Sequence, residues 1–186
     1  MNIHKGFTLI ELLVTIAIAA IVVMFAIPNF TSSIRKSRTT TYANEFLTAL
    51  NLARSEAIKR GVQVTMLRKG STSGQWESGW DVFIDQDANE TFNDDNDSNL
   101  CEMTNGMPAE DCLLKTYPGL AAGFTLRTGG STYKDYIAFD SSGLSTQTVG
   151  DTFRLCDSSA NTSNSRSIVI NAVGRARISK GTNQCP

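Results

Sequence analysis

The sequence predicts an α+β protein in which a long N-terminal helix packs against the antiparallel β-sheets of a globular head. Three observations support this prediction: an apolar run near the N-terminus, an amphipathic helical pattern after it, and about eight short β-like runs in the remainder. The chain has 186 residues, 41% hydrophobic and 19% charged, so its length suits one folded domain with an additional segment.

The apolar run extends over residues 7–27. As a helix it would be roughly 31 Å long, at about 1.5 Å per residue, which is enough to cross a hydrocarbon core. Lys5 precedes it, and a positive flank of this kind is retained on the cytoplasmic side. An ordinary secretory signal is the alternative, but no small-x-small cleavage site follows the run directly.

Glu11 is an acid inside this apolar run. A carboxylate in such a segment costs a few kcal/mol unless it finds a partner. We expect that partner to be a positive charge from another subunit, and such a pair would fix the register between neighbouring helices.

The segment Lys5-Gly6-Phe7-Thr8-Leu9-Ile10-Glu11-Leu12-Leu13 resembles the class III signal of type IV pilins and of the pseudopilins of type II secretion. The resemblance implies that a prepilin peptidase cleaves after Gly6 and N-methylates Phe7. It also implies that Glu11 pairs with the N-terminal amine of a neighbouring subunit. Pro28 stands where such pilins carry a helix-kinking proline. Residues 1–6 are then a leader, and residues 7–29 the membrane and filament-core half of the helix.

Residues 30–61 are expected to form the amphipathic half of the same helix. Apolar residues recur there at helical spacing, with polar residues between them: Ala43, Phe46, Leu47, Leu50, Ala53, Ala57 and Ile58. Lys59 and Arg60 followed by Gly61 are typical of a helix C-terminus. We therefore predict one helix from Phe7 to about Arg60.

The head is expected to comprise residues 62–186. Its candidate strands are Val62–Leu67, Trp80–Asp85, Leu113–Tyr117, Phe124–Arg127, Ile137–Phe139, Thr152–Cys156, Ser167–Asn171 and Arg175–Ser179. The segment Asp85–Asn99 is rich in Asp and Asn and lacks basic residues, which predicts a long surface loop.

Three further stretches resemble the FimU, FimT and GspH group of minor pilins and pseudopilins. They are Ala53-Arg54-Ser55-Glu56-Ala57-Ile58-Lys59-Arg60-Gly61, Gly79-Trp80-Asp81-Val82-Phe83-Ile84-Asp85 and Gly174-Arg175-Ala176-Arg177. The resemblance implies a subunit of low abundance near a filament tip, which helps start assembly with other minor pilins. It also raises DNA binding, because some FimT proteins bind incoming DNA during natural transformation.

The candidate DNA-binding residues are Arg175, Arg177 and Lys180. In DNA-binding FimT proteins a Gly-Arg-x-Arg-x-Cys segment carries the binding, whereas Ser179 stands here at the cysteine position. Arg175 and Arg177 alternate along a predicted strand and should project from one face, suited to phosphate contact. The alternative is an exposed edge strand that its charges protect from aggregation.

The four cysteines are expected to form two disulfides on the exported side of a membrane. Three pairings are possible from the sequence. We favour Cys101 with Cys112, which would close the acidic loop, and Cys156 with Cys185, which would tie the C-terminal tail to a strand. Each bond would be worth roughly 3 kcal/mol by the chain-entropy estimate.

The acidic segment offers weak candidates for calcium ligands in Asp85, Asp87 and Asn89. Their alternating oxygens resemble the start of an EF-hand loop. Continuing that register places Glu90 where the turn needs glycine and Asn96 where a bidentate glutamate belongs. We therefore expect a solvated loop and no bound metal.

The composition argues against an enzyme. The single histidine, His4, lies in the expected leader, so histidine-relayed catalysis and a His-bearing zinc site are excluded in the processed chain. We expect no catalytic residues, no cofactor and no small-molecule substrate. A net charge of −1 also argues against nucleic acid covering the whole surface.

The favoured function is a minor pilin near the tip of a type IV pilus. A DNA receptor and a pseudopilin of type II secretion are the alternatives. The expected partners are other minor and major pilins, prepilin peptidase and the inner membrane, with double-stranded DNA as a candidate. Before assembly the chain is expected in the inner membrane as a single pass with its head in the periplasm, and afterwards in the filament.

Overall fold

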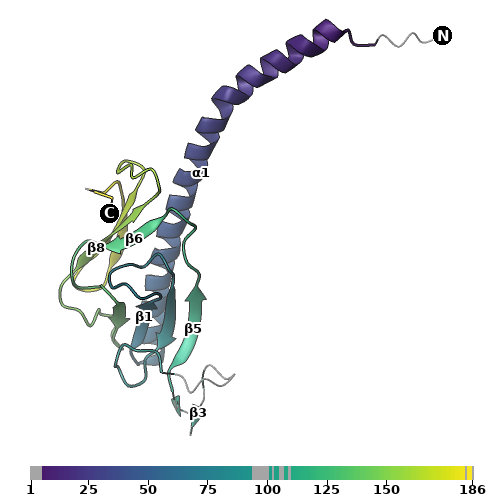
Figure 1. The fold of residues 1–186 in the computed structure, drawn as a ribbon. Helices are drawn as coiled ribbons and strands as arrows, with labels where there is room; N and C mark the ends of the chain where they lie inside the picture. The colour runs from purple at the N-terminus through teal and green to yellow at the C-terminus, as the bar shows by residue number, and fades with distance from the viewer. Residues whose placement is uncertain are drawn as a thin grey trace. The chain divides into compact units, whose positions relative to one another are not determined.

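A computed structural model describes residues 6–93, 101, 103–104, 107–108, 110–182 and 184–185. The side chains of residues 25–29, 103–104 and 107–108 are not described. Leader residues 1–5, the side chain of Pro28 and part of the acidic segment therefore lie outside the described residues. Two compact units are present, Met1–Arg38 and Thr39–Pro186, and the helix α1 (Leu9–Arg60) contributes to both (Figure 1).

The start of α1 is set by a capping box formed by Thr8 and Glu11. The Thr8 hydroxyl oxygen accepts a hydrogen bond from the Glu11 N–H at 3.3 Å, and the Glu11 carboxylate accepts one from the Thr8 N–H at 2.8 Å. Because these bonds satisfy donors that have no partner inside the helix, α1 begins at Leu9, two residues later than Phe7.

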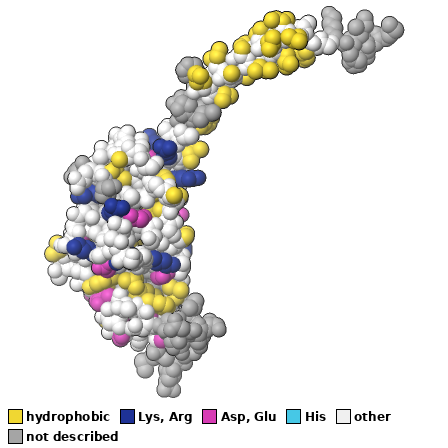
Figure 2. All heavy atoms as spheres, in the orientation of Figure 1, with side chains coloured by type: hydrophobic (Ala, Val, Ile, Leu, Met, Phe, Trp, Pro, Cys, Tyr) yellow, Lys and Arg dark blue, Asp and Glu magenta, His cyan; other side chains and the backbone are white. Residues whose placement is uncertain are grey.

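In the first unit all described side chains of residues 6–38 are exposed. Apolar side chains dominate the N-terminal part of α1 (Figure 2). Within the described residues, no helix reaches the combination of length and apolar character that defines a candidate membrane span.

In the second unit one stripe of α1 is buried in the head. The stripe consists of Ala43, Phe46, Ala49, Leu50, Ala53 and Ala57. Ile58 was expected in this stripe but is exposed, and its side chain lies against Gly143. At Gly61 the backbone has a φ of 71°, which glycine adopts without strain, and its N–H bonds to the Ala57 carbonyl. The predicted end of the helix at Arg60 is confirmed.

Two four-stranded antiparallel sheets form the rest of the head, as far as the chain is described. Sheet A has the order β5-β2-β1-β7 and sheet B the order β10-β9-β8-β6. Sheet A consists of β1 (Val64–Arg68), β2 (Trp80–Ile84), β5 (Cys112–Tyr117) and β7 (Tyr136–Phe139). Sheet B consists of β6 (Thr125–Thr128), β8 (Asp151–Cys156), β9 (Arg166–Ile170) and β10 (Ala176–Lys180). The predicted α+β class with antiparallel sheets is thus confirmed.

Each of the eight predicted strands corresponds to one of these strands, with ends that differ by at most two residues. The short pair β3 (Met103–Thr104) and β4 (Met107–Pro108) was not predicted, because two-residue strands have no alternating pattern. The last strand was predicted from Arg175 but begins at Ala176.

The core lies where α1 meets both sheets. Phe46 is fully buried, and its ring lies 5.1 Å from that of Trp80 in sheet A and 4.8 Å from that of Phe153 in sheet B. Trp76 completes this aromatic group at 5.6 Å from Phe46. One helical side chain therefore joins all three layers of the head.

Replacing Phe46 with alanine is expected to lower the free energy of unfolding of the head by about 3–5 kcal/mol, because it removes these ring contacts and leaves a cavity. Denaturant titration followed by tryptophan fluorescence measures this change. Phe46→Leu is the matched control, and a smaller loss is expected. Equal losses for the two variants would show that the ring contacts are not what holds the helix to the sheets.

Candidate assembly and binding sites

The predicted processing and assembly residues are exposed at the start of α1. The Phe7 side chain is 86% exposed, and an added Cβ at Gly6 would have no neighbour within 4 Å. The Glu11 carboxylate also accepts a hydrogen bond from the Thr8 hydroxyl at 2.8 Å. Among the described residues Thr8 is its sole partner, and none of the positive charges that the structure describes neutralises Glu11.

The predicted basic strand is the edge strand of sheet B. β10 pairs with β9 so that Arg177 lies opposite Val169. Arg175 precedes the strand, and its N–H donates to the Asn171 side-chain oxygen at 2.8 Å. Arg175 and Arg177 are both exposed and line one hollow of about 210 Å³, as expected for two residues on one face.

The structure does not bring Lys180 to the same face. Along β10 it lies on the same face as Ala176 and Ile178, which pack against the core, and therefore on the face opposite Arg177. Arg154 of β8 was not among the candidates. It lies opposite Ser167, which lies opposite Ser179, so Arg154 shares the outer face of sheet B with Arg177. Once the strand order is known, the alternation of side chains along each strand shows that Arg154 lies on the face of Arg177 and that Lys180 does not.

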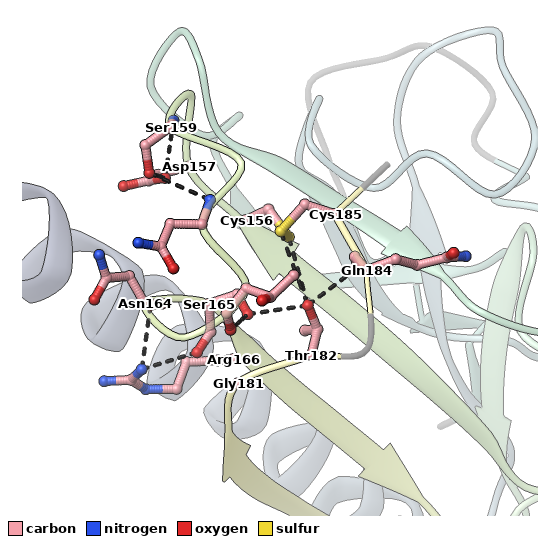
Figure 3. The surroundings of a disulfide bond; sticks show 12 residues. Cys156, Asp157, Ser159, Asn164, Ser165, Arg166, Gly181, Thr182, Gln184 and Cys185 are labelled. Atoms are coloured by element: carbon pink, nitrogen blue, oxygen red, sulfur yellow. Dashed lines mark hydrogen bonds between the residues drawn. A yellow bond between two sulfur atoms is a disulfide. The ribbon is translucent and has the colours of Figure 1, made fainter.

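The C-terminal tail is fastened to sheet B by the disulfide between Cys156 and Cys185, the pairing that we favoured (Figure 3). The Thr182 hydroxyl accepts a bond from the Ser165 hydroxyl at 3.0 Å and donates to the Gln184 carbonyl at 3.0 Å. The Gly181 N–H donates to the Ser165 carbonyl at 2.9 Å. The tail is therefore part of the folded head.

Arg166 belongs to the same region, but its side chain is held by hydrogen bonds within the head. Its guanidinium donates to the carbonyls of Asn164 at 3.2 Å and Ser165 at 2.9 Å (Figure 3), and to the Thr40 hydroxyl of α1 at 2.9 Å. Arg154, Arg175, Arg177 and Lys180 have no side-chain hydrogen bond or ion pair with the residues that the structure describes. These four remain available to an anionic partner.

The second disulfide joins Cys101 to Cys112 at the start of β5, again the pairing that we favoured. It lies beside an acidic cluster. Asp85 directly follows β2 and Asp111 directly precedes β5, and the pairing of Ile84 with Cys112 brings these two buried acids together at the ends of adjacent strands.

Oxygens of Asp85, Asp87 and Asp111 lie within 4.8 Å of one another. N–H and O–H groups of the protein already donate hydrogen bonds to these carboxylate oxygens. Asp85 accepts from the Thr65 hydroxyl at 2.7 Å and from the Glu90 N–H at 3.0 Å, and Asp111 accepts from the N–H groups of Gln86 and Asn93, each at 2.8 Å. The carboxylates thus organise the loop.

Asn89, the third calcium candidate, bonds through its side-chain N–H to Asp87 at 2.7 Å, and its side-chain oxygen accepts from the Thr91 N–H at 2.8 Å. Sequence reasoning missed Asp111, which lies more than twenty residues from Asp85. Its position directly before a cysteine at a strand start was the available signal.

Burial raises the pKa of Glu90, and the charges of Asp85 and Asp87 raise it further. Burial likewise raises the pKa of Asp111, partly offset by the bonds from Asn93 and Gln86. A carboxyl with a raised pKa binds its proton more tightly in the folded state, so the free energy of unfolding falls as the pH rises through that pKa.

Glu90→Gln is therefore expected to raise the melting temperature of the chain at pH 7, because it removes a carboxyl whose charged form is disfavoured by burial and by the charges of Asp85 and Asp87. The advantage should vanish at a pH below the ordinary range of a glutamate, where Glu90 is protonated in both the folded and the unfolded state. Thermal melts of wild type and variant between pH 3 and 8 measure this. A pH-independent difference would contradict the assigned cause.

The family model described as type II transport protein GspH matches residues 42–174, and that of the prokaryotic N-terminal methylation motif matches residues 1–27. The type IV major alpha-pilin of Moraxella bovis is 41% identical over 73 residues, which are 39% of this chain and 45% of that pilin. The chain thus aligns with less than half of the length of this relative.

Two solved structures share the fold. The type IV minor pilin FimU of Pseudomonas aeruginosa has a TM-score of 0.59 at 18% identity, covering 81% of this chain and 96% of that one. The minor pseudopilin EpsH of the Vibrio cholerae type 2 secretion system has a TM-score of 0.50 at 15% identity, covering 77% and 97%.

A long N-terminal helix with a methylation motif and a head of two antiparallel sheets define a subunit of the type IV pilin and pseudopilin class. Within that class, the chain belongs to the GspH family, whose model covers most of its head. This is a family of structural pilins and pseudopilins.

Proposed function

We propose that this chain is a minor pilin incorporated near the tip of a type IV pilus, where it helps to start assembly. The observation that carries the proposal is the exposed N-terminal helix. It combines an apolar surface with a Glu11 that has no cationic partner among the described residues, next to a methylation motif. An apolar surface of this kind is stable only when lipid or other subunits cover it, since each Å² removed from water contributes about 25 cal/mol.

The proposed mechanism follows from the charges. Cleavage after Gly6 leaves a new amine on Phe7. The Glu11 carboxylate of one subunit then forms an ion pair with the Phe7 amine of its neighbour. In an apolar surrounding an unpaired carboxylate is costly, so the pair fixes one register between helices. Before assembly the same segment is proposed to lie in the inner membrane, with the head in the periplasm, where its disulfides form.

Glu11→Ala is expected to reduce the amount of this chain in sheared filaments at least about tenfold, because the amine of the neighbour loses its partner and stays buried and unpaired. The head should fold as in wild type. Quantitative immunoblots of the filament and cell fractions measure this.

Thr8→Ala is the matched control. It removes the capping bonds to Glu11 but keeps the carboxylate, so incorporation should stay near wild type. Equal losses in the two variants would mean that Glu11 acts by capping α1, and normal incorporation of Glu11→Ala would remove the assembly role.

DNA binding is the second candidate, favoured by three arginines on the outer face of sheet B that have no side-chain partner among the described residues. Arg175 and Arg177 line one hollow, and Arg154 lies on the same face. Their charges suit the phosphate backbone without base specificity. This pair of exposed arginines also inclines us to the pilus rather than to a pseudopilin of type II secretion, which co-purification with pilus or secretion components distinguishes.

Replacing Arg175 and Arg177 together with alanine is expected to weaken duplex DNA binding by the chain. The slope of log affinity against log salt should fall by about two units, one for each lost phosphate contact. Salt-dependent fluorescence anisotropy measures both quantities. Lys180→Ala, on the other face of β10, should change them less, and an unchanged double variant would remove DNA contact through these arginines.

A further inference from the structure

The large apolar side chains that the head exposes gather in three neighbouring segments. In the described part of residues 39–186 they are Ile58 at 53%, Leu144 at 44%, Val149 at 62% and Val173 at 44% exposed. Ile58 lies in the last turn of α1. Leu144 and Val149 lie in the loop after β7, and Val173 lies in the turn between β9 and β10.

The helix end and the loop after β7 are in direct contact. The Ile58 side chain packs over Gly143, where an added Cβ would come within 2.5 Å of Ile58 Cδ1. Leu144 follows this glycine, and its carbonyl accepts a bond from the Asp140 N–H at 2.9 Å, which closes the turn. Ile58 and Leu144 therefore share one surface.

The turn between β9 and β10 lies beside the same loop. An added Cβ at Gly174 would be 3.2 Å from the backbone N of Ser145, the residue after Leu144, so Val173 borders this surface. At Gly150 an added Cβ would be 3.0 Å from the Asn171 Cα at the start of that turn, so the chain at the exposed Val149 also lies beside this turn. We call Ile58, Leu144, Val149 and Val173 the apolar patch.

The border of the apolar patch is basic. Arg54 lies against Gly143, where an added Cβ would be 3.4 Å from its Cγ, and Arg175 and Arg177 follow Val173 in the chain. None of these arginines has an ion pair with a described residue. Asp140, an acid of this region, accepts bonds from the N–H groups of Ser142 at 2.9 Å and Leu144 at 3.0 Å, so it is occupied within its own turn.

An exposed apolar centre with a charged border is typical of a protein contact surface. The charge of the border also restricts which partner can bind. Two copies of this chain that met patch to patch would place arginines against arginines, and facing like charges at an interface cost several kcal/mol. A surface with an apolar centre and carboxylates around it is complementary instead.

We propose that the apolar patch and its arginine border are the docking site for the head of a different pilin-type subunit, one that presents apolar side chains surrounded by carboxylates. The inference rests on the proposed function as a filament subunit. It adds the face of the head that selects the neighbour, separate from the contact between α1 helices.

Photo-crosslinking in the host cell tests this docking site. A benzophenone amino acid replaces Leu144 in the full-length chain, and mass spectrometry identifies the adducts. Ser71 is the matched control position, because it is exposed and follows the C-terminal end of β1, whereas the loop with Leu144 follows the residue of β7 that pairs with the N-terminal end of β1. We expect the Leu144 probe to give an adduct with another pilin-type subunit, and the Ser71 probe to give none.

Charge reversal then tests the border. Arg54→Glu combined with Arg175→Glu should lower the yield of the Leu144 adduct by about tenfold, because carboxylates then face carboxylates. Ser71→Glu should leave the yield unchanged. An adduct between two copies of this chain, an adduct with nucleic acid, or a yield insensitive to Arg54 and Arg175 would overturn the proposal.

A second probe at Val14 of α1 distinguishes a failure of the docking site from a failure of the proposed filament role. Adducts at Val14 but none at Leu144 would overturn the docking site and leave the proposed filament role standing. The absence of pilin adducts at both positions would overturn the filament role and the docking site together.

Discussion

The packing of one narrow stripe of α1 against two sheets is the constraint on which the rest of the head depends. Small alanines at 43, 49, 53 and 57 let the sheets approach the helix closely, and Phe46 fills the space between them. Because the ring of Phe46 meets Trp80 of sheet A and Phe153 of sheet B, neither sheet has a complete core without the helix. The head is therefore organised around a helix whose other half, in the residues that the structure describes, is exposed.

The sheet edges follow from this arrangement. The outer edge of β6 is covered by the segment around Trp76, whose N–H donates to the Leu126 carbonyl at 2.8 Å, and that of β7 by the Thr146 N–H, which donates to the Ala138 carbonyl at 3.0 Å. In the described structure β5 and β10 are the edges that remain. Each carries exposed cations, Lys115 on β5 and Arg177 and Lys180 on β10, which oppose strand addition. Edge protection and recognition of an anionic partner are compatible uses of the same arginines.

Local patterns were sufficient to predict the helix and the eight longer strands, whereas the sequence left three disulfide pairings open, of which the favoured one is present. Gly61 after two cations ends α1 by local chemistry alone, and alternating apolar residues define strands such as β8. Features that depend on strand pairing were not accessible in this way. Asp111 meets Asp85 only because β5 pairs with β2, and Arg154 joins the basic face only because β8 lies two strands from β10. Ile58 continues the apolar period, and yet its side chain is exposed. The period alone could not predict this, since it does not show where the sheets that cover the helix end.

The central claim is that this chain is processed into a filament subunit through its N-terminal helix. Mass spectrometry of the N-terminal peptide, from the filament fraction of cells that express the full-length chain, tests it most directly. The account predicts a peptide that begins at Phe7 and carries a methyl group on its amine. A chain that keeps Met1, or that is absent from filaments while abundant in the cell, would contradict it.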